Sequence, residues 1–107
     1  MTTVHVRRDE NGVCGLRVSG HAGYARAGKD IVCAAASVLI TTCANSLESV
    51  VHVTPVLEQI INPAVISVSL PEGLSPEEDH DARIVLQTTL QGFTDIAAQY
   101  PRYLQII

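Results

Sequence analysis

Residues Ser19 to Ser37, SGHAGYARAGKDIVCAAAS, contain a histidine and a cysteine at a spacing that fits nucleophilic catalysis. Asp30 is a preferred N-cap residue type, so we expect a helix to begin there with Cys33 in its first turn. Unpaired backbone N–H groups and the positive end of the helix dipole converge at that turn. They stabilise a thiolate, the reactive form of cysteine, so the position of Cys33 predicts a nucleophile.

His21 is the candidate base, because an imidazole can take the thiol proton and later protonate a leaving group. The loop 22–29 is long enough to bring a strand end and a helix start side by side. Gly20, Gly23 and Gly28 allow this loop to close over a bound substrate. The residue types and spacing leave an alternative open, since a buried cysteine and an exposed strand-end histidine are both common structural features.

Asp30 and Ser37 are candidate supporting residues, and each has two possible roles. Asp30 can cap the helix, and it can orient the His21 imidazole as the third member of a catalytic group. Ser37, one helical turn after Cys33, can hydrogen-bond the thiolate or an intermediate, or bond back to its own helix. The backbone N–H groups around Cys33 are candidates for an oxyanion hole.

Candidate substrate contacts lie in and beside the loop, at Gly20, Ala22, Tyr24 and Gly28. The remaining histidines are scattered and the cysteines lack a C-x-x-C spacing, so we expect neither a metal site nor a cofactor. Two other cysteines fall in predicted strand and helix interiors and are expected to be packing residues: Cys14 and Cys43.

The elements that must position this chemistry follow the order ββαββα. A hairpin is expected around Asn11-Gly12, a helix from Asp30 to about His52, and a second hairpin over 56–61 and 64–70. A second helix begins at the capping box Ser75–Glu78 and ends before Pro101, with a possible short strand over 102–107. This pattern predicts an α+β two-layer sandwich: one antiparallel sheet with both helices on one face.

Two further expectations come from patterns within these elements. Leu16 and Val18 share the core face of the second strand, so alternation assigns His21 to the opposite face, just past the strand end. The first half of the first helix is apolar almost all round, which a second subunit would cover. The second helix carries an inner apolar stripe: Ala82, Leu86, Leu90, Phe93 and Ala97.

Composition places the chain among small globular proteins. Its 107 residues, 47% of them apolar, fit a single domain over 1–107. The net charge of −4 argues against a protein that binds nucleic acid through phosphates. MTTVHVRRDE lacks the apolar core of a signal peptide, and the apolar run 31–44 is too short to span a bilayer. With an odd number of cysteines, we expect a reduced, cytoplasmic setting.

The blocks Gly20-His21-Ala22 and Asp30-Ile31-Val32-Cys33-Ala34-Ala35, with Gly28 between them, resemble the signature of the ribosomal-processing cysteine proteases called Prp. The element order and the segment Ile96 to Pro101 extend the resemblance along nearly the whole chain. The resemblance implies an endopeptidase that removes the N-terminal extension of the large-subunit ribosomal protein numbered twenty-seven. It implies Cys33 as nucleophile, His21 as base, Asp30 and Ser37 in support, and a homodimer.

A second hypothesis is a non-enzymatic module that binds a basic ribosomal or assembly partner. The acidic residues cluster at Glu72 and over 77–81, and this face would attract such a partner. A cluster of this kind is also common as a plain solvated surface.

Overall fold

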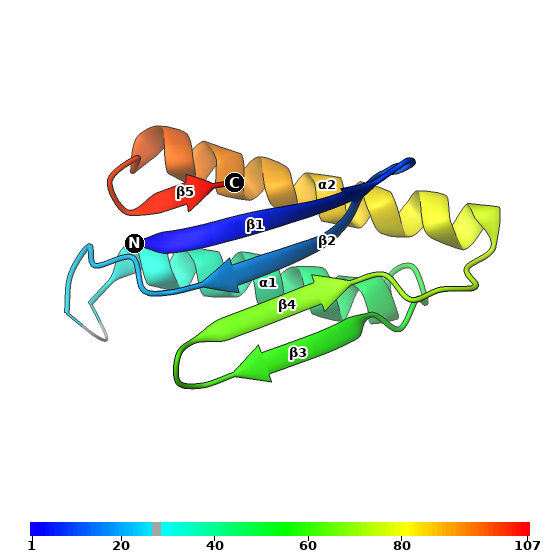
Figure 1. Cartoon of the computed structure of the whole chain (residues 1–107), viewed down its shortest axis with the longest axis horizontal. Coiled ribbons are helices and arrows are strands. Elements are labelled where there is room, and N and C mark those ends of the chain that lie inside the picture. Colours follow the sequence, from blue (N-terminus) through cyan, green and yellow to red (C-terminus); the bar gives the residue numbers. More distant parts are fainter. Residues whose placement is uncertain (27–28) are drawn as a thin grey trace.

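The computed structural model describes residues 1–26 and 29–107, and it has the predicted element order with a short fifth strand (Figure 1). The elements are β1 (Thr2–Asp9), β2 (Gly12–Ser19), α1 (Ile31–Ser49), β3 (Val56–Ile60), β4 (Val65–Ser69), α2 (Pro76–Gln99) and β5 (Leu104–Ile106). The helix predicted to reach His52 ends three residues earlier, and the other boundaries agree to within a residue or two.

The five strands form one sheet in the order β3-β4-β2-β1-β5, and both helices lie on the same face (Figure 1). β1–β2, β2–β4 and β3–β4 pair antiparallel, but β5 pairs parallel to β1. The predicted α+β fold with both helices on one face is confirmed, but the sheet is mixed, because the short β5 pairs parallel where the prediction gave an antiparallel sheet. The cause is the α2 crossover, which returns the chain beside β1 in the same direction. The two ends of the chain thus belong to one sheet.

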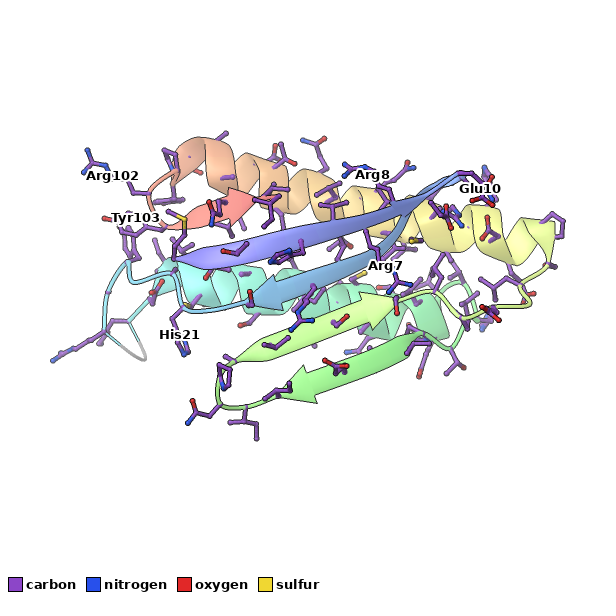
Figure 2. The ribbon with its side chains drawn as sticks, in the orientation of Figure 1. Arg7, Arg8, Glu10, His21, Arg102 and Tyr103 are labelled. Atoms are coloured by element: carbon purple, nitrogen blue, oxygen red, sulfur yellow. The ribbon has the colours of Figure 1, made fainter. Side chains whose placement is uncertain are left out.

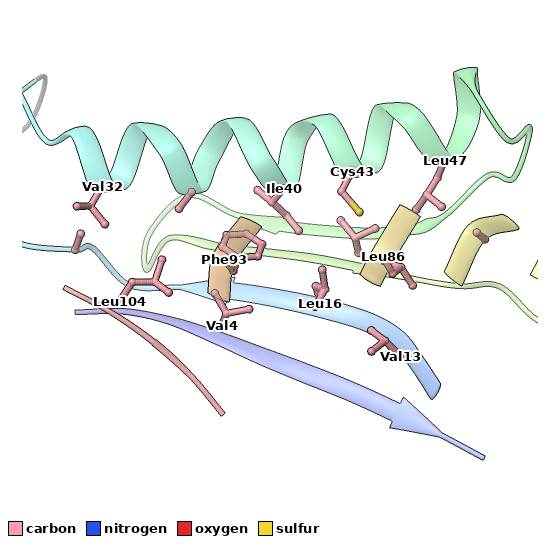
Figure 3. Packing of buried hydrophobic residues seen from close by; sticks show 14 of the residues in the cluster. Val4, Val13, Leu16, Val32, Ile40, Cys43, Leu47, Leu86, Phe93 and Leu104 are labelled. Atoms are coloured by element: carbon pink, nitrogen blue, oxygen red, sulfur yellow. The ribbon is translucent and has the colours of Figure 1, made fainter. Parts of the chain in front are cut away.

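The core lies between the sheet and the two helices (Figure 3). Phe93 of α2, Ile40 of α1 and Leu16 of β2 are among its fully buried side chains. Cys14 and Cys43 are buried packing residues, as predicted. Within the predicted stripe of α2, Ala82, Leu86 and Phe93 are buried, and Leu90 and Ala97 are half-buried.

Two sets of polar contacts fix α2: a capping box at its own start and an ion pair to the end of β1. The Ser75 side chain accepts the Glu78 N–H while Glu78 accepts the Ser75 N–H, which completes the predicted capping box. The buried Arg83 guanidinium donates to Asp79 of its own helix and, at 2.7 Å, to Asp9 at the end of β1. These carboxylates raise the pKa of Arg83, and Arg83 lowers the pKa of Asp9.

The helix α1 packs only one side into this core. The apolar run 31–44 is too short to span a bilayer, but the full helix of 19 residues is longer than that run and could cross a membrane by length and composition alone. Its inner residues Val32, Ala36 and Ile40 are buried against the sheet. Gly92 lets α2 approach closely, because a Cβ there would lie 2.8 Å from a Leu39 methyl group. On the outer side Val38 is 64% exposed, so the predicted apolar surface of α1 is present and uncovered by this chain.

Candidate active site

Asp30 is the N-cap of α1, as predicted, and it also ties down the preceding loop. Its Oδ1 accepts the N–H groups of Val32 at 3.0 Å and Cys33 at 2.9 Å, while Oδ2 accepts the Tyr24 N–H at 3.0 Å. These donors, the Cys33 N–H foremost, hold the pKa of Asp30 below its usual range. No hydrogen bond between described residues joins Asp30 to His21.

Gly20 redirects the chain immediately after β2. Its φ of +81° lies in the region that only glycine adopts readily, and its N–H donates to the Ala64 carbonyl at 3.1 Å. A Cβ at this position would lie 2.6 Å from the Met1 carbonyl oxygen. The backbone at the end of β2 is therefore held between β4 and the start of β1.

This change of chain direction brings His21 to the face of the sheet that α1 covers. The exposed His21 lies beside the end of β2 (Figure 2), and it lines two clefts together with Cys33 and Ser37 of α1. The prediction that His21 continues the strand alternation on the face opposite the core is wrong. Alternation ends at Ser19, because the positive φ of Gly20 breaks the two-residue period.

Ala22 brings the loop backbone into direct contact with the cysteine. Its N–H donates to Cys33 Sγ at 3.2 Å, and the residue is buried, with 3% of its surface exposed. A larger side chain at this position would hold the backbone away from α1. The sequence motif Gly20-His21-Ala22 therefore combines a turn, an exposed imidazole and a close backbone approach.

Two clefts meet at the half-buried Cys33. The first, of about 270 Å³, lies between α1 and the β2–β4–β3 part of the sheet, and its lining is mainly apolar. Ile40, Ile61 and Ile66 contribute to it. The second, of about 540 Å³, lies on the loop side and includes Asp30 and Gly23. An extended peptide crossing Cys33 would meet apolar surface on one side and the loop on the other.

The other predicted substrate contacts have different surroundings. The Tyr24 ring packs edge-on against Tyr100 at 5.5 Å and Tyr103 at 5.1 Å between ring centroids, which anchors the loop to the C-terminal segment. Gly20 lines the first cleft, whereas Tyr24 is absent from both linings. Gly28 lies outside the described residues. A direct contact of any of these residues with substrate stays a prediction.

The residues that sequence reasoning missed come from the β3–β4 hairpin. Gln59, Ile60 and Ile61 line the first cleft, although they are about 30 residues from Cys33. Only the apolar run at 60–61 next to a turn hinted at an exposed apolar surface, and Ile61 is 88% exposed. Ser37 lines both clefts, and its hydroxyl makes no hydrogen bond with another described residue.

A cysteine in the first turn of a capped helix, with a histidine lining the same clefts, has the parts needed for attack on a carbonyl carbon. On this small α+β scaffold the combination defines a thiol hydrolase. The family model of cysteine protease Prp matches residues 1–105, and the chain belongs to this family of cysteine proteases.

Similar proteins span the whole fold. The ribosomal processing cysteine protease Prp of Bacillus subtilis (strain 168) is 23% identical over 100 residues, which cover 94% of this chain and 89% of that protein. The S. aureus protease Prp with a covalently linked product peptide superposes with a TM-score of 0.87 at 25% identity, covering 99% of this chain and 97% of that one. The crystal structure of SMU.848 from Streptococcus mutans superposes with a TM-score of 0.86 at 25% identity, covering 99% of this chain and 91% of that one.

The Gly20→Ala variant tests the turn that presents His21. The added methyl group meets both the unfavourable φ and the Met1 carbonyl, so we expect peptide cleavage to fall at least tenfold. Gly73→Ala is the matched control, because Gly73 also has a positive φ but an added Cβ there meets nothing within 4 Å. Equal losses of activity in the two variants would show that the position of His21 does not depend on Gly20.

The Asp30→Asn and Asp30→Ala variants separate the two ties made by Asp30. Asn also caps helices well, so Asp30→Asn should keep α1 but lose the ionised Oδ2 acceptor for Tyr24, which speeds amide hydrogen exchange at Tyr24. Asp30→Ala should lose both and melt at a lower temperature.

The pH dependence has a definite sign. Because the folded pKa of Asp30 is lowered, its stabilisation is present above the ordinary carboxyl range, about pH 4, and is lost as pH falls through the folded value. Both variants should show a weaker fall of melting temperature on acidification than the wild type. If the melting temperature of both variants fell with decreasing pH as steeply as that of the wild type, this account of Asp30 would be contradicted.

Proposed function

We propose that this cysteine protease removes the N-terminal extension of the large-subunit ribosomal protein numbered twenty-seven, with Cys33 as nucleophile and His21 as general base. The observation that carries the assignment of the two residues is their shared lining of both clefts, with Cys33 in the first turn of α1. The substrate proposal is supported by the name of the B. subtilis relative, a ribosomal processing protease.

Each group then has a step in the reaction. His21 takes the proton of the Cys33 thiol, and the sulfur attacks the scissile carbonyl carbon. The tetrahedral intermediate collapses, the C–N bond breaks, and His21 gives its proton to the departing amine. Water, deprotonated by His21, then hydrolyses the thioester and releases Cys33. Asp30 supports these steps by fixing the start of α1, and Ser37 is placed to contact the bound peptide.

The clefts fit an extended, partly apolar segment of a basic protein. The apolar surface contributed by Ile40, Ile61 and Ile66 suits apolar side chains beside the scissile bond. The chain's net charge of −4 favours encounter with basic ribosomal proteins at low salt. All three cysteines, each within the described residues, are free thiols, which agrees with a reduced cytoplasmic setting.

The acidic cluster has a structural role that weakens the idea of a pure binding module. Glu78 completes the capping box of α2, and Asp79 pairs with Arg83 at 2.8 Å. Acidic side chains also interact favourably with the N-terminal end of a helix dipole. Glu78 and Asp79 therefore need no binding partner to explain their presence.

Cleavage of the extended ribosomal protein by purified enzyme tests the proposal directly. Cys33→Ala and His21→Ala should each reduce cleavage by at least a thousandfold, because each removes a group that takes part in bond making or proton transfer. Cys14→Ala and His5→Ala are controls, since neither residue lines a cleft with Cys33. Full activity in Cys33→Ala would refute the assignment, and cleavage only of other proteins would refute the substrate.

We also propose that two copies associate through the uncovered face of α1 and α2. Val38, Leu39 and Ile96 contribute to an apolar surface there. Sedimentation of the wild type should give a dimer, and Val38→Asp should shift it toward monomer because a charge would be desolvated in the interface. Ile84→Asp is the control, at an exposed site of α2 outside this surface. A monomeric wild type at micromolar concentration would contradict the proposal.

A further inference from the structure

We propose that the backbone N–H of Ala22 is the donor that stabilises the oxyanion of the tetrahedral intermediate, an inference that rests on Cys33 being the nucleophile. This N–H already donates to Cys33 Sγ at 3.2 Å. When the sulfur bonds to a carbonyl carbon, the oxygen that becomes negative is only two bonds from the sulfur. A donor directed at the sulfur is therefore placed to reach that oxygen with a small adjustment.

The N–H groups of Cys33 and its two neighbours, which the sequence analysis named as oxyanion-hole candidates, are already engaged. Those of Val32 and Cys33 donate to Asp30 Oδ1 at 3.0 and 2.9 Å. The N–H of Ala34 donates to the Asp30 carbonyl at 3.1 Å and begins the helix ladder. To serve an oxyanion, any of these would have to give up a hydrogen bond that caps the helix.

The Ala22 N–H is held in place from both sides before any substrate binds. On one side, Gly20 is fixed by its bond to Ala64. On the other, the Tyr24 N–H is held by Asp30 at 3.0 Å. The buried methyl group of Ala22 fills the core beneath the loop. Such preorganisation is what makes a backbone donor effective, because little reorganisation is needed as charge develops.

The same donor serves each stage of the reaction. Sulfur attack forms the C–S bond and moves the carbonyl π electrons to oxygen, which accepts the Ala22 N–H. Collapse restores the carbonyl and breaks the C–N bond, and His21 protonates the amine. Attack by water, with its proton passing to His21, creates a second oxyanion at the same place. Collapse then breaks the C–S bond and returns the thiolate to the Ala22 N–H.

Replacing the Ala22 amide with an ester tests the proposal, because lactic acid at position 22 substitutes oxygen for the N–H and leaves the side chain unchanged. The full chain can be assembled by ligating synthetic 1–32 to 33–107 at Cys33. We expect kcat to fall by about 10²–10³ with little change in KM. The corresponding hydroxy acid at Glu10 is the matched control, since the Glu10 N–H has no acceptor among the described residues and Glu10 lines neither cleft, so this ester should matter little.

Alkylation by iodoacetamide separates an effect on the thiolate from an effect on the oxyanion, because alkylation forms no oxyanion. The Ala22 ester should slow alkylation of Cys33 far less than it slows cleavage. A parallel fall in both rates, or a fall in kcat of less than tenfold, would overturn the proposal. Acylation by p-nitrophenyl acetate gives a readout that needs no ribosomal substrate, so a wrong substrate assignment remains distinguishable from a wrong donor.

A second measurement uses the unmodified protein and does not depend on how the ester variant folds. A small trifluoromethyl ketone forms an adduct with a thiol that carries an oxyanion. In the adduct the ¹⁵N-labelled Ala22 amide proton should move strongly downfield, as expected for a charge-assisted hydrogen bond. An Ala22 amide signal that stays in place while Cys33 is fully modified would exclude the Ala22 N–H as the donor.

Discussion

The geometry of the site depends on one carboxylate. Asp30 accepts the Val32 and Cys33 N–H groups through one oxygen and the Tyr24 N–H through the other. It therefore holds both the start of the helix that carries Cys33, the proposed nucleophile, and the preceding backbone at Tyr24. Its interactions are with backbone donors, so the side chain acts on the position of Cys33 and leaves the His21 ring to be positioned by the β2 turn.

The other half of the site depends on that turn. Gly20 is fixed against Met1 and Ala64, and this sends His21 to the rim shared with α1 while Ala22 enters the core. A strand that kept its alternation would place the histidine on the uncovered face of the sheet, away from Cys33. The short block Gly20-His21-Ala22 thus places an imidazole in the clefts that Cys33 lines and a backbone donor on the Cys33 sulfur.

The scaffold leaves Cys33 open to two clefts. The helix α1 covers β2 and β4, while the β3–β4 hairpin extends past it and forms an apolar wall with Ile60 and Ile61. Gly23 and Ala25 line the opposite side, and the neighbouring Tyr24 is anchored against Tyr100 and Tyr103. A peptide that enters between these walls meets Cys33 at the meeting point of two clefts, which is consistent with endopeptidase action on an extended segment.

Local signals in the sequence determined the elements, the Asp30 cap, the capping box of α2 and the candidate pair His21 and Cys33. Such signals act over a few residues, through turn geometry, capping and periodicity, and can be recognised without a fold. Tertiary structure alone decided the parallel pairing of β5 with β1, the face on which His21 lies, the apolar wall from β3 and β4, and the contact of Ala22 with sulfur. These features depend on packing between segments distant in the chain, and the face of His21 depends on a single backbone angle at Gly20. Neither long-range packing nor one backbone angle produces a recognisable pattern of residue types in the sequence.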